Sequence, residues 1–254
     1  MCGDRVSFSL WPFLLVYQNK KKVKKLIYVT GDTHGGYDGG KIISFADTEE
    51  GKNLTKEDYV IVLGDFGYIF YPEETLKEKQ ELERFQRYPW TTLFLDGNHE
   101  NFDRLNSYPV EAWKGGNIHK INDSVYHLMR GDVFEIDGNK LFVMGGAVSI
   151  DKEHRREGVS WWAAENVSYA ECEHSLMNLE RYGNKVDFIL THTCPNSFIK
   201  KISNYIMKDP ASDFFDELKK NVKYKRWYFG HHHVDLDVGK LSCLQERVLK
   251  LGEK

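Results

Sequence analysis

The chain has 254 residues and a formal net charge of −3 at pH 7, with 41% hydrophobic and 14% aromatic residues. This length allows one α/β domain with a large core, and the charge balance excludes a strongly basic protein that attracts nucleic acid by its bulk charge. The cysteines lie far apart, which excludes a disulfide framework or a thiolate zinc site and favours a cytoplasmic location. They are Cys2, Cys172, Cys194 and Cys243.

The first 25 residues differ in charge from the rest of the chain. They hold six Lys or Arg residues and one Asp, so their charge is +5 and that of the remainder is −8. Their apolar stretch, residues 6–17, is short, contains Pro12 and precedes the basic run, so it matches neither a membrane span nor a secretory signal. A peripheral membrane anchor is the alternative. We predict an N-terminal extension over residues 1–25, a single domain over residues 26–254, and no membrane span.

Five short apolar runs each end at side chains that can bind metal. The runs are rich in β-branched and aromatic residues, which is typical of buried strands. They span residues 26–30, 59–63, 92–95, 187–190 and 226–229. In an open α/β sheet, ligands bind beyond the carboxyl ends of the strands, so we predict one shared metal site. The side chains that follow the runs are Asp32, His34, Asp65, Asn98, His99, His192, His231 and His233.

Further strands and helices are predicted between these runs. Helical spacing and capping residues predict helices over 72–87, 101–107, 162–182 and 213–222. Strands are predicted over 125–129, 133–136 and 141–144, and one or two closing strands within 241–251. Asp137 and Gly138 predict a hairpin turn. Because strands both alternate with helices and form hairpins, we expect mixed sheets.

The motif order Asp-x-His, Gly-Asp, Gly-Asn-His-Glu, His and Gly-His-x-His resembles the calcineurin-like metallophosphoesterases, including bacterial and phage-type metallophosphatases. The resemblance covers residues 26–240. It implies an α/β fold of two packed mixed β-sheets flanked by helices, an αββα sandwich, with the site on loops at one end. It also implies a dinuclear-metal-dependent hydrolase that acts on phosphate esters.

The resemblance also implies which residues hold the two metal ions, which we expect to be manganese, iron or zinc. One ion is assigned to Asp32, His34, Asp65 and His233. The other is assigned to Asp65, Asn98, His192 and His231, so Asp65 is the bridge. Taken singly, a Gly-Asp turn or a buried His is more often structural; the ordered set favours metal. Residues at i and i+2 of an extended chain share a face, so Asp32 and His34 should point together, as should His231 and His233, with His232 pointing away.

Two ions would lower the pKa of a bridging water, and the resulting hydroxide would attack phosphorus. The resemblance gives His99 the role of protonating or stabilising the leaving-group oxygen; a structural His that caps the loop is the alternative. Many protein-phosphatase-like members carry an Asp at the position of Tyr68, which orients this His, and an Arg after it. Their absence leaves open what orients His99. Glu100 is expected to lie near the ligands without being one.

The segment 145–162 is not explained by the metal motifs. Gly145 and Gly146 would let the backbone turn close to a ligand. Arg155 or Arg156 could then clamp the phosphate, because a planar guanidinium matches phosphate oxygens. The alternative is a solvated loop whose tryptophans pack on the core.

We expect a phosphomonoesterase whose partner is its phosphate-ester substrate. A phosphodiesterase or nuclease on the same site is one alternative, with nucleic acid only as a substrate. A non-catalytic metallophosphoesterase-like scaffold that binds proteins is the other.

Overall fold

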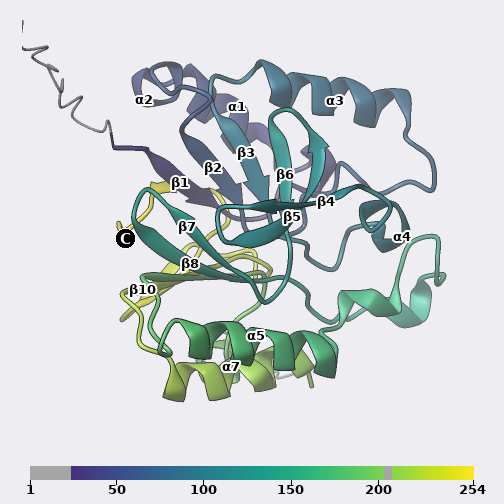
Figure 1. Ribbon diagram of the computed structural model, residues 1–254. Helices are drawn as coiled ribbons and strands as arrows, with labels where there is room; N and C mark the ends of the chain where they lie inside the picture. Colours follow the sequence, from purple (N-terminus) through teal and green to yellow (C-terminus); the bar gives the residue numbers. More distant parts are fainter. Residues whose placement is uncertain (1–23, 203–207) are drawn as a thin grey trace, which may run out of the picture.

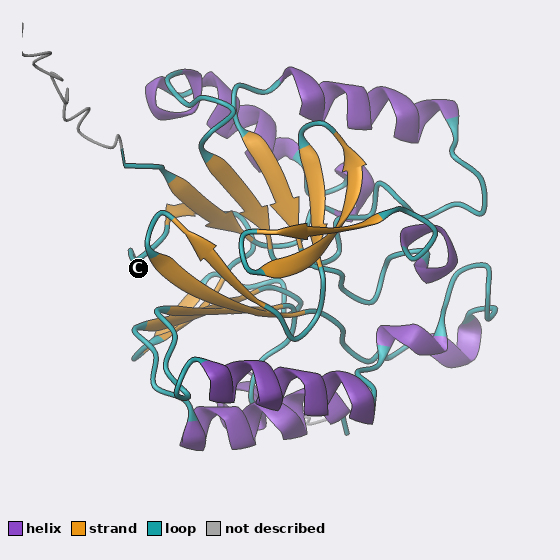
Figure 2. Cartoon of the chain, viewed as in Figure 1, coloured by secondary structure: helices purple, strands orange, loops and turns teal. Residues whose placement is uncertain are grey.

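The computed structural model describes residues 24–202 and 208–254, so the predicted extension lies almost entirely outside the described residues (Figure 1). Two β-sheets pack face to face between outer layers of helices (Figures 1 and 2), which confirms the predicted αββα sandwich. No helix in the described ranges combines the length and the hydropathy needed to cross a membrane.

Both sheets are mixed, as predicted. The seven-stranded sheet has the order β13 (Val248–Lys250), β1 (Ile27–Thr30), β2 (Tyr59–Val62), β3 (Thr91–Phe94), β6 (Val125–Leu128), β5 (Gly116–Asn122) and β4 (Val110–Trp113). The six-stranded sheet has the order β11 (Leu236–Val238), β12 (Leu241–Cys243), β10 (Arg226–Phe229), β9 (Phe188–Thr191), β8 (Asn139–Met144) and β7 (Val133–Ile136). Strands β1, β2, β3 and β6 run parallel, as do β8, β9, β10 and β12. Their carboxyl ends therefore gather at common edges.

Alternating side chains of the strands fill two different layers of the core. Ile61 of β2 and Val143 of β8 lie in the cluster between the sheets. Val60 of β2 packs beneath the first helical layer, and Phe142 of β8 packs beneath the second. Because both faces of each sheet are covered, the central strands are apolar throughout, which is why they could be recognised as continuous runs.

The first helical layer contains α1 (Gly40–Asp47), α2 (Glu49–Lys52) and α3 (Leu76–Arg87). The second contains α5 (Tyr169–Arg181) and α7 (Pro210–Asn221), and α6 (Asn196–Ile202) contacts α7. The short α4 (Phe102–Leu105) follows the third metal motif, and three 3-10 turns occur, η1 (His34–Gly36), η2 (Lys152–His154) and η3 (Ala163–Glu165).

Two predicted helices begin later in the chain than expected, and a capping residue marks each observed start. The helix predicted over 162–182 begins at Tyr169, because the Ser168 side chain accepts the backbone N–H of Glu171 and completes a capping box. The helix predicted over 72–87 begins at Leu76, where Thr75 and Glu78 form the same arrangement. The hairpin turn was predicted correctly: Asp137 and Gly138 both have positive φ, 51° and 77°. Strands β4, β5 and β11 and helices α1, α2 and α6 were not predicted.

Candidate metal centre

The loops that follow β1, β2, β3, β9 and β10 bring the predicted side chains together at one end of the sandwich. Their ligand atoms form three overlapping groups, and within each group all atoms lie within 4.8 Å of one another. The groups are Asp32 with His34 and His233, Asp65 with His192 and His231, and His34 with Asp65 and His99. The first two groups correspond to the two sets that the family resemblance implies.

The Asp65 carboxylate lies between the two sets. Its Oδ2 is 3.1 Å from Nε2 of His34 and 3.4 Å from Nε2 of His192. On the far side of the first set, His233 Nε2 is 3.3 Å from Asp32 Oδ2. In the second set, Asn98 Oδ1 lies 3.2 Å from His192 Nε2. A single carboxylate oxygen thus faces both sets, as a bridging ligand must.

The backbone at several of these residues is not extended, so the sequence-based explanation of how Asp32 and His34 converge was wrong. His34, His231 and His233 have φ of 44°, 66° and 49°, and Asp65 has φ of 46°. This left-handed region is sparsely populated by residues other than glycine, and it occurs at sites where surrounding structure holds the chain in place. Turns, not strand alternation, therefore bring these side chains together.

Hydrogen bonds fix which ligand atoms face the centre. Asp65 Oδ1 accepts the backbone N–H groups of Asn98 and His99, both at 2.8 Å, which leaves Oδ2 free. His192 donates from Nδ1 to the carbonyl of Leu63 at 2.8 Å, and His34 donates from Nδ1 to Asp38 Oδ2 at 2.7 Å. Partners of this kind set the tautomer and orientation of metal-binding imidazoles. Asp38 was missed, because a lone Asp four residues after a His carries no distinctive signal.

Two glycines of the motifs are required by close approach to a carboxylate. A Cβ atom on Gly97 would lie 2.1 Å from Asp65 Oδ1, and one on Gly230 would lie 2.1 Å from Asp32 Oδ1. Both distances are far shorter than a van der Waals contact. The Gly in the Gly-Asn-His and Gly-His-x-His motifs therefore makes room for the carboxylate from another strand end.

The buried charges of the centre depend on one another. Burial lowers the pKa of His192, but the nearby Asp65 carboxylate outweighs this and raises the pKa to about 10. Burial likewise lowers the pKa of His34, whereas its contacts with Asp65 raise it to about 9. Asp32 and Asp65 are at most 1% exposed. Two buried carboxylates that attract positive charge, together with imidazole and amide donors, fit a pair of borderline metal ions.

Two neighbouring residues lie outside the ligand groups. Glu100 is fully buried and its carboxylate accepts backbone N–H groups of Phe66 and Gly97, each at 2.6 Å. Glu100 thus joins the loop after β2 to the loop after β3. It was expected to lie near the ligands without being one. The imidazole Nε2 of His232 lies 3.2 Å from Sγ of the buried Cys194. Like Glu100, His232 belongs to none of the three groups.

Of the two arginines predicted to face substrate, the structure brings Arg155 to the centre. Arg155 Nη1 lies 3.1 Å from His99 Nδ1, and Arg155 Nε lies 2.8 Å from Asp151 Oδ1. Arg156 is exposed. Burial lowers the pKa of His99; Asp65 acts against this, and Arg155 adds to the lowering. Arg155 is therefore a charged side chain in direct contact with His99, the residue for which the sequence left the orienting group open.

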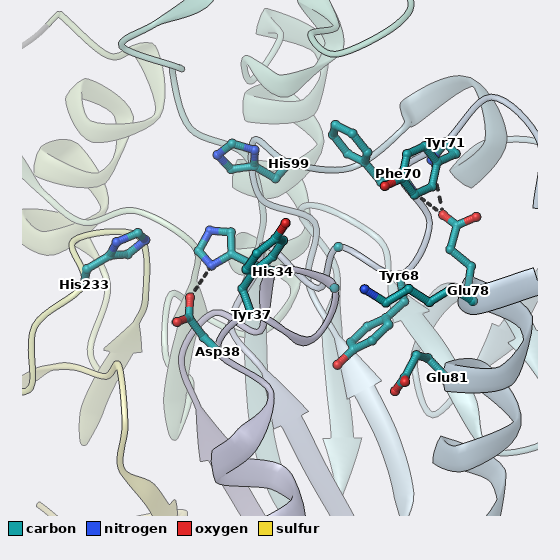
Figure 3. Close-up of a pocket in the computed structure, with 13 residues that line it drawn as sticks. His34, Tyr37, Asp38, Tyr68, Phe70, Tyr71, Glu78, Glu81, His99 and His233 are labelled. Atoms are coloured by element: carbon teal, nitrogen blue, oxygen red, sulfur yellow. Dashed lines mark hydrogen bonds and ion pairs between the residues drawn. The ribbon is translucent and has the colours of Figure 1, made fainter. Parts of the chain in front are cut away.

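A cavity of about 510 Å³ adjoins the centre (Figure 3). His34, His99 and His233 line one side of it. The remaining lining is aromatic and charged: Tyr37, Tyr68, Phe70, Tyr71, Asp38, Lys77, Glu78 and Glu81, with Gly35 and Gly67. The sequence did not reveal this cavity, because its walls come from the loops after β1 and β2 and from α3.

Known proteins are similar to this chain over most of its length. The family model described as calcineurin-like phosphoesterase matches residues 25–235. The human lariat debranching enzyme is 26% identical over 243 residues, covering 82% of this chain and 42% of that protein. The lariat debranching enzyme of Schizosaccharomyces pombe is 25% identical over 190 residues, covering 65% of this chain and 40% of that protein. The chain thus spans about two fifths of the length of these relatives.

Proposed function

This chain belongs to the calcineurin-like phosphoesterase family, and we propose that it is a metal-dependent phosphodiesterase. The similarity to lariat debranching enzymes, which are phosphodiesterases, supports diester hydrolysis over the monoester hydrolysis expected from the sequence. The observation that carries the proposal is the cavity beside His34, His99 and His233. A phosphodiester has two organic groups, and the cavity offers room for the second, which a monoester lacks.

We propose that Asp32, His34, Asp65 and His233 hold one ion. We propose that Asp65, Asn98, His192 and His231 hold the other. The Asp65 oxygen that faces both His34 and His192 supports this assignment. When bound, the ions would activate water and neutralise the phosphoryl oxygens.

The chain's own residues would act on the leaving group and the phosphate. His99 lies in one of the three groups of possible ligands, but neither proposed ion uses it. It would therefore be available to protonate or stabilise the departing oxygen. Arg155 lies beside His99 and brings a guanidinium to the same place, where it would bind a phosphoryl oxygen. A diester phosphate carries one negative charge, so a single arginine beside the ions would be enough to bind it.

Hydrolysis of two chromogenic esters by the Mn²⁺-loaded chain tests the proposal. We expect bis-p-nitrophenyl phosphate to be cleaved with a kcat/KM at least about tenfold above that for p-nitrophenyl phosphate, a difference of about 1.4 kcal/mol in transition-state stabilisation. A preference for the monoester would restore the phosphomonoesterase assignment. Cleavage of neither ester by protein that holds two metal ions would favour the non-catalytic scaffold.

A further inference from the structure

The cavity beside the metal centre has a wall of aromatic rings that ordinary packing does not explain. Tyr37 is 92% exposed and Tyr71 is 50% exposed, although both side chains carry large aromatic rings. Both line the cavity together with Phe70, and Figure 3 shows the Tyr37 ring beside His34 and the Phe70 and Tyr71 rings on the side of Glu78. Exposed aromatic rings that border a concave site are typical of ligand binding rather than of folding.

Polar contacts to Glu78 and Arg104 hold part of this wall in place. The backbone N–H groups of Phe70 and Tyr71 donate to Glu78 Oε1 at 2.8 and 3.2 Å. Arg104 Nη1 donates to the carbonyl of Tyr71 at 2.6 Å and to Glu78 Oε1 at 3.0 Å. Glu78 is only 4% exposed. These bonds fix the backbone at Phe70 and Tyr71, so the loop that carries both rings is held in position without a ligand.

The charges that line the cavity restrict what can enter it. Asp38, Glu78 and Glu81 line it together with Lys77, so carboxylates outnumber ammonium groups in the described lining. Glu78 is paired with Arg104, Asp38 with His34 and Glu81 with Arg84, so this lining offers no cluster of unpaired cations. A run of phosphates would find little positive charge to hold it on such a wall, whereas a neutral planar ring needs none.

We propose that the cavity binds the nucleobase of a small nucleotide diester while its phosphate lies at the metal centre. The proposal rests on the proposed phosphodiesterase function and names its substrate class. A volume of about 510 Å³ is within the range of sites for small molecules, roughly 300–1,000 Å³. Contacts of the base with the rings of both Tyr37 and Tyr71 would hold it whichever base it is, because every base presents a π-face.

Equilibrium binding to the Mn²⁺-loaded full chain tests the proposal without turnover. Adenosine 5′-monophosphate and ribose 5-phosphate share a phosphate and a sugar and differ in the base. We expect calorimetry to show the nucleotide binding at least about fivefold more tightly, the lower end of what stacking supplies. Tyr37→Ala and Tyr71→Ala should each reduce this preference and leave the affinity for ribose 5-phosphate unchanged. Tyr71→Phe should retain it.

Tyr169→Ala is the matched control, because Tyr169 is an 83% exposed tyrosine at the start of α5, in the other helical layer. It should leave both affinities unchanged. Equal affinities for the two ligands in the unmodified chain would overturn the nucleobase site, even if bis-p-nitrophenyl phosphate is hydrolysed. A preference for the nucleotide without diester hydrolysis would instead refute the proposed function alone. Tighter binding of a thymidine tetranucleotide than of any mononucleotide would overturn the assignment to a small substrate.

Discussion

Asp65 is the residue on which the centre depends most. Its Oδ1 is occupied by two backbone N–H groups, and its Oδ2 faces both His34 and His192. Asp65→Asn would replace a bridging anion by a neutral amide, so we expect loss of nearly all activity and of metal at both positions. Elemental analysis and diester hydrolysis measure this. An active variant with two metal ions per chain would contradict the dinuclear assignment.

His99 should behave differently from the ligands. Since it is assigned to the leaving group, His99→Ala should keep both metal ions and lose turnover. The deficit should shrink for esters whose alcohols are strongly acidic, because these need little protonation as they depart. A series of aryl diesters with increasing leaving-group pKa measures the trend. Equal losses across the series would argue against the acid role, and loss of metal would make His99 structural.

Arg155 and Arg156 form a natural pair of variants, because they are adjacent and only Arg155 contacts His99. Arg155→Ala should lower kcat/KM for diesters by about tenfold or more, which corresponds to about 1.4 kcal/mol, with metal content intact. Arg156→Ala should have little effect. Steady-state kinetics of both variants measures the contribution of each arginine. Equal kinetics in Arg155→Ala and the unmodified chain would show that segment 145–162 has a purely structural role.

At the scale of elements, the centre is built from loops that brace one another. Glu100, from the loop after β3, accepts backbone N–H groups of Phe66 and Gly67 in the loop after β2, and of Gly97 in its own loop. Glu100→Gln would place an amide NH₂ against one of these N–H groups and leave a buried donor unsatisfied. We expect a loss of about 1–3 kcal/mol in the free energy of unfolding and weaker metal binding.

Chemical denaturation and metal titration of Glu100→Gln measure both effects. A variant with unchanged stability and metal affinity would show that the loops hold their positions without this carboxylate. Glu81→Gln is a suitable control, because Glu81 is also a glutamate near the site but pairs with Arg84 at the surface of α3.

The strand ends could be predicted because the information is local: an apolar run buried on both faces is followed at once by a ligand such as Asp65 or His192. The resemblance then supplied the pairing of ligands. Asp38 and the contact between Arg155 and His99 could not be predicted, because they depend on turns with positive φ and on a segment that returns to the site from 56 residues away. The start of α5 was missed because the capping box at Ser168 outweighed the apolar residues before it.

For the whole molecule, a buried ion pair at the end of the seven-stranded sheet that carries the centre lies against the segment that follows β8 of the other sheet. Asp96 follows β3, and its carboxylate accepts two N–H groups of Arg130, which follows β6, at 2.6 and 2.8 Å. The carbonyl of Asp96 accepts the N–H of Gly146, after β8 of the other sheet, at 3.0 Å. Arg130 also donates to the carbonyl of Ala164 at 3.0 Å. Segment 145–162 is thereby tied to the loop that carries Asn98 and His99.

Arg130→Met should therefore destabilise the fold strongly, because it leaves the Asp96 carboxylate buried without its cation. Removing one partner of a buried pair costs about 3–5 kcal/mol of unfolding free energy. Lys220→Met is the matched control, because Lys220 forms an exposed pair with Glu217 and its loss should change stability little. Replacing both charges, as Asp96→Asn with Arg130→Met, should recover part of the loss because the stranded charge is then gone. Denaturant unfolding of the four proteins measures these differences, and equal stability of Arg130→Met and Lys220→Met would show that the buried pair does not stabilise the fold.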